Sequence, residues 1–137
     1  MMLFSQVRGL PVLTAGGERI GVLKTLTVDA RAGTVTHVRV RERHARRETV
    51  LPWAALYAVG PDAVLVRPAV APHTVPPLHD VLGRQVLTER GEGHGTVLDV
   101  AFDPATGRTA AVYTTLGALP ADRLLGLGDH ALVVRAA

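Results

Sequence analysis

The stretch VRGLPVLTAGGERIG, residues 7–21, returns later in the chain as VLGRQVLTERGEGHG, residues 81–95. A shift of 74 positions aligns residues 7–38 with 81–112 without a gap. The identical positions in this block are Val7, Gly9, Val12, Leu13, Thr14, Gly17, Glu18, Gly21, Asp29, Gly33 and Val38. A second block, residues 51–67, matches residues 119–135 at a shift of 68. Two blocks in the same order indicate a tandem duplication, in which the second copy lacks six residues between Val38 and Leu51.

The glycine-rich GEGHG, residues 91–95, has the composition of a phosphate-binding loop or a metal site, and the duplication bears on both readings. In the first copy, Arg19 and Ile20 stand in place of Gly93 and His94. The stretch also lacks the GK[ST] ending and the strand–loop–helix context of a P-loop. What the copies share predicts a Gly-Glu turn between two strands, with a second glycine where backbones crowd or the strand bends.

Composition indicates a globular protein without thiol chemistry. The chain has 137 residues, 47% of them hydrophobic, and no cysteine. A core is therefore expected, whereas disulfides, thiolate metal sites and cysteine nucleophiles are excluded. The N-terminal residues do not have the pattern of a signal peptide, and no apolar run approaches the roughly 20 residues that span a bilayer. We expect a soluble cytoplasmic protein with no transmembrane segment.

Short strands and tight turns dominate both copies. Residues 20–28 show a period-two apolar pattern that Lys24 interrupts, and Leu98, Val100 and Phe102 continue it in the second copy. The stretches 28–35 and 102–109 predict hairpin turns, in which an aspartate binds nearby backbone N–H groups and a glycine takes positive φ. The Leu-Pro sequences at 51–52 and 119–120 each predict one helical turn with proline near its start.

These elements predict an all-β fold of two tandem small β-barrels, each with five to six short strands and one short helical turn, because closing a small sheet hides its edges. We expect the first domain at residues 1–69, a proline-rich linker at 70–78 and the second domain at 79–137. The linker should be extended and semi-rigid. The two small domains are expected to pack into one pseudo-symmetric body.

The pattern resembles the PRC-barrel family. The first copy carries it as Gly9, Val12, Gly17, Glu18, Gly21, Asp29, Gly33, Leu51, Pro52, Leu56 and Gly60. The second copy repeats it at Gly83, Val86, Gly91, Glu92, Gly95, Asp103, Gly107, Leu119, Pro120, Leu124 and Gly128. The family includes the cytoplasmic domain of the photosynthetic reaction-centre H subunit and the C-terminal domain of the ribosome maturation factor RimM. The resemblance implies non-catalytic β-barrels that dock to larger assemblies, and it supplies no catalytic residue.

The densest charge lies in RVRERHARRE, residues 39–48, which the second copy largely lacks. Arg39, Arg41 and Arg43 alternate along a strand and should share one face, while Arg46 and Arg47 lie near the hairpin tip. Residues 1–69 carry ten Lys and Arg against five Asp and Glu, a net +5, whereas residues 70–137 carry five against seven, a net −2. Three readings stay open: a solvated hairpin, an acidic protein partner, and RNA or another polyanion. The hairpin has no aromatic residue on which bases could stack.

Other residues give little sign of chemistry. The six histidines show no H-x-x-x-H or H-E-x-x-H spacing, and Ser5 is the only serine. We expect no catalytic residue, no metal site and no cofactor. Trp53 is interpreted as a core residue or as a contact, and with Tyr57 it forms a candidate interface to the sister domain or to a partner.

The sequence thus favours a non-catalytic interaction or assembly module that docks to a protein partner or forms a homo-oligomer. The alternative is an RNA- or ribosome-associated factor that binds through the arginine-rich hairpin. A third class, an enzyme or small-molecule binder in the cleft between the barrels, would need converging polar groups with shifted pKa values.

Overall fold

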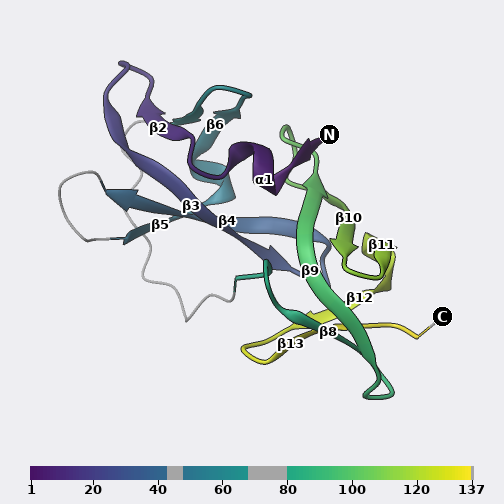
Figure 1. The fold of residues 1–137 in the computed structure, drawn as a ribbon. Coiled ribbons are helices and arrows are strands. Elements are labelled where there is room, and N and C mark those ends of the chain that lie inside the picture. The colour runs from purple at the N-terminus through teal and green to yellow at the C-terminus, as the bar shows by residue number, and fades with distance from the viewer. Residues whose placement is uncertain (43–47, 68–79, 137) are drawn as a thin grey trace.

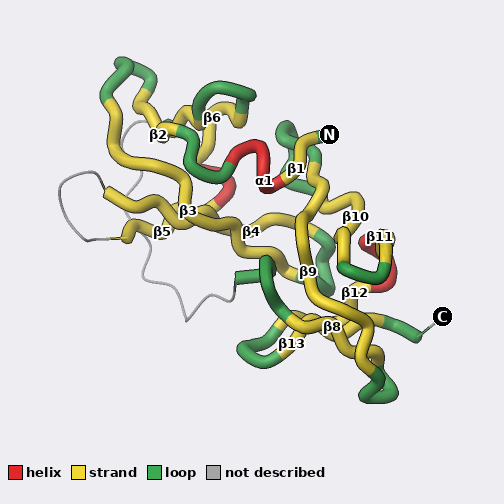
Figure 2. Tube along the Cα trace, viewed as in Figure 1, coloured by secondary structure: helices red, strands yellow, loops and turns green. Residues whose placement is uncertain are grey.

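The computed structural model describes residues 1–42, 48–67 and 80–136. Strands account for most of these residues (Figures 1 and 2). In chain order the elements are β1 (Met2–Leu3), α1 (Phe4–Val7), β2 (Pro11–Thr14), β3 (Arg19–Asp29), β4 (Thr34–Glu42), β5 (Glu48–Pro52), the 3-10 helix η1 (Trp53–Ala55), β6 (Leu56–Val59), β7 (Val64–Val66), β8 (Gln85–Thr88), β9 (Gly93–Phe102), β10 (Thr109–Thr114), β11 (Gly117–Pro120), the 3-10 helix η2 (Ala121–Arg123), β12 (Leu124–Leu127) and β13 (Ala131–Val134). The hairpin tip with Arg43, Arg46 and Arg47, and the predicted linker at 70–78, lie outside the described residues.

The two copies form two separate sheets with the same strand order. The first sheet runs β5-β4-β3-β2-β7-β6 and the second runs β11-β10-β9-β8-β13-β12. The β2–β7 and β8–β13 ladders are parallel, and the other ladders of the described strands are antiparallel. The all-β prediction is confirmed. Hydrogen bonds between the described strands do not close either sheet into a barrel, because β5 and β6, and likewise β11 and β12, are end strands.

The predicted hairpin turns are present in both copies. One carboxylate oxygen of Asp29 accepts hydrogen bonds from the backbone N–H groups two and three residues on, at 3.0 and 3.1 Å. Asp103 accepts the corresponding bond from the residue two positions on, at 2.9 Å. Gly33 and Gly107 take φ of 69° and 78°, a region that side chains other than glycine's avoid. These turns join β3 to β4 and β9 to β10.

The shared Gly-Glu motif is also a turn. Gly17 and Gly91 have φ of 85° and 78° between β2 and β3 and between β8 and β9. The second glycine of the first copy, Gly21, lies where two backbones meet, since a Cβ there would stand 2.2 Å from the carbonyl oxygen of Arg41. The interpretation as a turn followed by a crowding glycine is confirmed.

A β-bulge recurs in the long central strand of each copy and corrects the predicted period-two pattern. The β3–β4 register skips Lys24, and the β9–β10 register skips the equivalent Leu98. Such a bulge turns a side chain to the other face. Leu23 is therefore buried, whereas Val22 is only half-buried and Leu98 is 59% exposed. The prediction that Val22 and Leu98 share the buried face is wrong for that reason.

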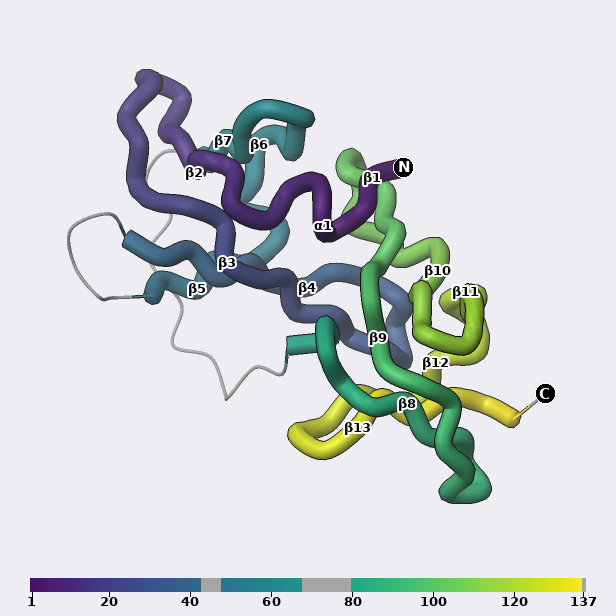
Figure 3. Tube along the Cα trace, in the orientation of Figure 1, coloured from purple at the N-terminus to yellow at the C-terminus, as the bar shows by residue number. Residues whose placement is uncertain are grey.

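The N-terminal segment belongs by sequence to the first copy but packs on the second. β1 pairs with β9, with Met2 opposite Phe102 and Leu3 opposite Ala101. The backbone N–H of Ser5 donates to the carboxylate of Asp99 at 3.0 Å. The short helix α1 lies against β9 (Figure 3). Phe4 is 1% exposed within a single hydrophobic cluster that draws on both copies. The expected packing of the copies into one body is observed.

The copies meet with an approximate two-fold relation. The N–H of Val35 donates to the carbonyl of Gly107 at 2.7 Å, and the N–H of Thr109 donates to the carbonyl of Gly33 at 2.8 Å. Gly33 corresponds to Gly107, and Val35 to Thr109, at the same shift of 74. Each copy therefore donates one backbone hydrogen bond to the other and accepts the equivalent bond in return, as the subunits of a symmetric dimer do. We call this contact, together with Trp53, the seam.

Candidate interaction surfaces at the seam and on the first sheet

Trp53 is a second side chain, besides Phe4, through which the first copy packs on the second. It follows Pro52, the N-cap residue of η1, whose φ of −68° suits the start of a helical turn. Its ring meets the buried Phe102 edge to face, with centroids 6.2 Å apart. A Cβ on Gly107 would stand 2.9 Å from the Trp53 ring. The indole and the glycine thus fit against each other, while Ala121 takes the equivalent place in the second copy.

A groove opens beside this contact. It has a volume of about 320 Å³ and is lined by Trp53 and all of β6 on one side, and by Pro104 and Ala105 of the second copy on the other. Tyr57 in this wall is 67% exposed. The guanidinium of Arg67 lies 5.8 Å from the centroid of its ring, within cation–π range. The groove therefore presents two aromatic side chains at the boundary between the copies.

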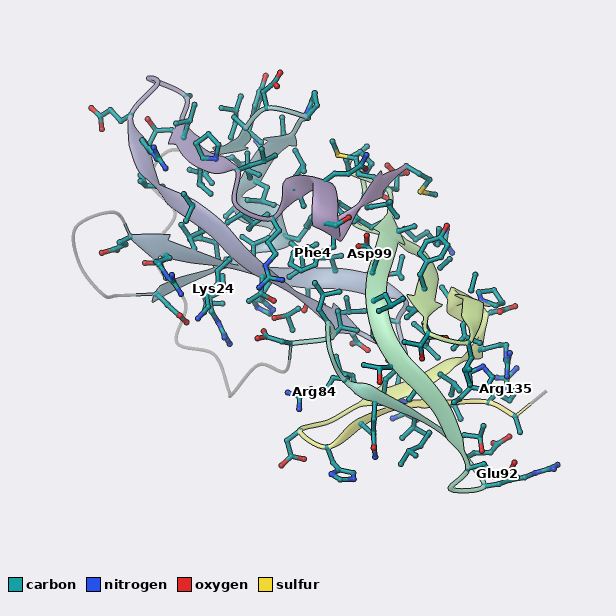
Figure 4. All side chains as sticks on the ribbon, in the orientation of Figure 1. Phe4, Lys24, Arg84, Glu92, Asp99 and Arg135 are labelled. Carbon is teal, nitrogen blue, oxygen red and sulfur yellow. The ribbon has the colours of Figure 1, made fainter. Side chains whose placement is uncertain are left out.

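Charged side chains gather on the outer face of the first sheet. The Lys24 ammonium donates to the carboxylate of Glu48, and the Arg39 Nε lies 3.5 Å from the same carboxylate. Arg39 also reaches Asp80, at 3.8 Å, and Asp80 accepts a hydrogen bond from Thr25 at 3.0 Å. Figure 4 shows Lys24, on β3, near β5 and away from Arg135, which follows β13. On this face, strand residues of the first copy contact Asp80, which lies at the beginning of the second copy.

The hydrogen bond from Lys24 holds the pKa of the Glu48 carboxyl below its ordinary value of 4.5, and the charges of Lys24, Arg39 and Arg41 act in the same direction. Partial burial opposes them. A lowered pKa in the folded state means that the carboxylate stabilises the fold above pH 4.5. That contribution is lost as the pH falls through the folded-state pKa.

Glu48→Gln is therefore expected to destabilise the protein at pH 7 and to lose its effect in acid. Because the Glu48 side chain is 33% exposed, solvent screening limits the cost to about 1 kcal/mol or less. Urea unfolding of the natural and variant proteins at pH 7, 4.5 and 3 measures the difference. A difference that stays constant across these conditions would contradict a role for the ionised carboxylate.

The second copy has uncharged side chains at the positions of Lys24 and Arg39. The strand registers place Leu98 where the first copy has Lys24, and Tyr113 where it has Arg39. Leu98 and Tyr113 are 59% and 40% exposed. The duplication has thus produced two like scaffolds with different outer faces.

The residues singled out from the sequence fall on two surfaces. Val38 and Val40 are buried, and Arg39 and Arg41 project from the opposite face of β4, as the alternation predicts. Trp53 and Tyr57 line the groove at the seam instead. Sequence reasoning missed Arg8 and Lys24, which line a separate hollow with Arg41. Lys24 could have been identified because it interrupts an apolar pattern, whereas no feature of the sequence singles out Arg8.

Within residues 1–42, 48–67 and 80–136, no three or more His, Asp or Glu side chains gather as metal ligands would. No helix in the described parts of the chain is long and apolar enough to cross a membrane.

Comparison with protein families gives two matches in this chain. The model of the PRC-barrel domain matches residues 1–70 and again residues 75–135. No curated protein matches the chain. The two matched segments correspond to the two copies of the duplication.

Proposed function

Because this chain belongs to the PRC-barrel family, whose domains are interaction modules and are generally non-catalytic, we propose that it is a non-catalytic assembly module that docks to a protein partner or to a second copy of itself. The observation that carries the proposal is the groove in which Trp53 and the exposed Tyr57 face Pro104 and Ala105 of the other copy. Aromatic side chains in partly enclosed sites are typical anchors of protein interfaces. We place this function in the cytoplasm.

We also propose that each copy has the shape of a small barrel. We assign residues 1–69 and 79–137 to two barrel-like units joined by 70–78, with the ends of each sheet brought together by side chains rather than by hydrogen bonds. In support, η1 joins the end strands β5 and β6 within three residues and buries Ala55. The short η2 likewise joins β11 and β12 within three residues.

A second candidate function is RNA or ribosome association through the arginine-rich segment. The net +5 of residues 1–69 and the outward Arg39 and Arg41 favour it, since phosphate contacts dominate non-specific nucleic-acid binding. The sequence of the segment offers no aromatic side chain for base stacking. Protein docking is therefore the leading proposal.

Affinity capture from a native-host lysate distinguishes the two functions. The baits are the intact protein, Tyr57→Asp in the groove, Tyr113→Asp as the matched tyrosine of the second copy, and Arg43/Arg46/Arg47→Ser. We expect one discrete protein on every bait except Tyr57→Asp, with no enrichment of nucleic acid. RNA that is retained by the intact bait and lost with the arginine variant would establish the second function instead. If the intact bait retains no discrete protein, the docking proposal is rejected.

A further inference from the structure

The outer face of the first sheet contains a hollow with a cationic lining. It has a volume of about 220 Å³ and is lined by Arg8, Gly9, Val22, Leu23, Lys24 and Arg41, which we call the cationic hollow. No carboxylate is among the described residues that line it. Lys24 is paired with Glu48, but neither Arg8 nor Arg41 forms a salt bridge with any carboxylate of the described residues. Both arginines are exposed. Glu48 pairs with Lys24 and stands opposite Arg41 in the β4–β5 ladder, so one carboxylate faces three cations and the hollow keeps a net positive charge.

Main-chain hydrogen bonds hold together the three segments that carry these cations. The N–H of Gly9 donates to the carbonyl of Leu23 at 2.8 Å, which fixes the loop that carries Arg8 against β3. The bulge turns Lys24 to the outer face, and Arg41 stands opposite Val22 in the β3–β4 ladder. The three cations therefore come from three separate segments that are tied together by main-chain hydrogen bonds.

The second copy has the same scaffold without the charges. The N–H of Gly83 donates to the carbonyl of Val97 at 3.0 Å, as Gly9 does to Leu23. The positions that correspond to Arg8, Lys24 and Arg41 hold Leu82, Leu98 and Thr115. Since the scaffold forms with uncharged residues there, the cations of the first copy are not needed to build it. Their mutual repulsion is a cost that a bound anion would remove.

We propose that the cationic hollow binds the dianion of a phosphate monoester. Two guanidinium groups offer the planar, paired donors that match phosphate oxygens, and the Lys24 ammonium adds a third positive charge. The described part of the lining has no aromatic ring on which a nucleobase could stack, so a compact phosphate group fits the hollow better than a nucleic-acid strand does. The group can be a free small phosphate or a phosphorylated side chain of a partner, because both present the same oxygens.

The test is a titration of the isotope-labelled full-length protein followed by backbone amide chemical shifts at constant ionic strength. The probes are inorganic phosphate, free phosphoserine, a phosphoserine peptide and acetate. Arg8→Gln/Arg41→Gln removes two cations from the hollow and leaves the Lys24–Glu48 pair. Arg90→Gln/Arg108→Gln removes the same charge from exposed positions of the second copy outside the hollow and serves as the matched control.

We expect phosphoserine to shift the amides of Gly9, Val22–Lys24 and Arg41 in a saturable manner at pH 7, and acetate not to do so. The Arg8/Arg41 double variant should bind about tenfold more weakly, whereas the control variant should bind as the natural protein does. Binding should weaken towards pH 5, because the second ionisation of a phosphate monoester lies at about pH 6. Tighter binding of the phosphoserine peptide than of free phosphoserine and inorganic phosphate would identify a modified partner as the source. Equal binding would identify a small phosphate.

Several results would overturn the proposal. The first is the same shifts with acetate, which indicate a general counter-ion effect. The second is an equal loss of binding in both double variants. The third is the lack of saturable shifts with any phosphate probe. If a uridine oligonucleotide shifts these amides with a steep salt dependence while the phosphate probes do not, the surface binds a polyanion and the compact site is rejected. The docking function proposed for the groove is unaffected by any of these outcomes.

Discussion

Phe4→Ala is expected to lower the free energy of unfolding by about 3–5 kcal/mol. Phe4 is 1% exposed and is among the largest fully buried side chains of the protein. Its removal leaves a cavity between α1, which the first copy supplies, and β9 of the second copy. Urea unfolding measures the total loss. Amide hydrogen exchange should also show faster opening in β9, far from the substitution in sequence, because the anchor of the N-terminal segment is gone.

The neighbouring Ser5 provides the control. Its side chain is exposed and its hydroxyl donates to Asp99, so Ser5→Ala should cost only the roughly 0.5–1.5 kcal/mol of one hydrogen bond. A cost for Phe4→Ala no greater than that of Ser5→Ala would show that the N-terminal segment does not anchor the second copy.

Gly107→Ala is expected to cost roughly 3 kcal/mol, the second largest effect, because it combines two penalties. At φ of 78° an alanine is strained. The added Cβ would also lie 2.9 Å from the Trp53 ring, which Phe102 confines from another side. The symmetry-related Gly33 separates the backbone strain from the contact with the ring, since it has φ of 69° and no atom within 4 Å of the added Cβ. Gly33→Ala should therefore cost only the strain, about 1–2 kcal/mol.

A double-mutant cycle checks this assignment. In a Trp53→Ala background, Gly107→Ala should cost no more than Gly33→Ala does, because the ring that opposed the Cβ has been removed. Urea unfolding of the four proteins gives the coupling energy. If Gly107→Ala costs the same with and without Trp53, the two residues do not meet at the seam.

Features set by neighbouring residues could be predicted from the sequence. The Asp29 and Gly33 turn, its counterpart at Asp103 and Gly107, and the proline-led η1 and η2 depend on local backbone preferences and local hydrogen bonds. The duplication also predicts a turn at Gly91 and Glu92 rather than a ligand loop, since the first copy keeps the turn without the glycine and histidine that follow it. The alternation that buries Val38 and Val40 and exposes Arg39 and Arg41 likewise follows from strand geometry.

Features that depend on distant contacts could not be predicted in this way. Lys24 interrupts an apolar pattern in the sequence, yet the bulge makes it an outward residue, and no residue type marks a bulge reliably. Phe4 lies in a short N-terminal segment whose pairing with β9 has no sequence signal. Gly107 and its counterpart Gly33 both have an ordinary role in a turn. The second role of Gly107, as the surface that receives Trp53, follows only from the packing of one copy on the other.

The central claim is that the pair of copies, rather than either copy alone, is the unit that folds and presents the groove at the seam. The most direct test is a urea titration of the full-length protein in which the native amide resonances of both copies are followed in the same samples. We expect the resonances of β2–β7 and of β8–β13 to disappear with one common midpoint, together with the fluorescence change of Trp53, because one hydrophobic cluster includes residues of both copies. Two separate midpoints, one for each copy, would contradict the claim and would make the seam a contact between independent domains.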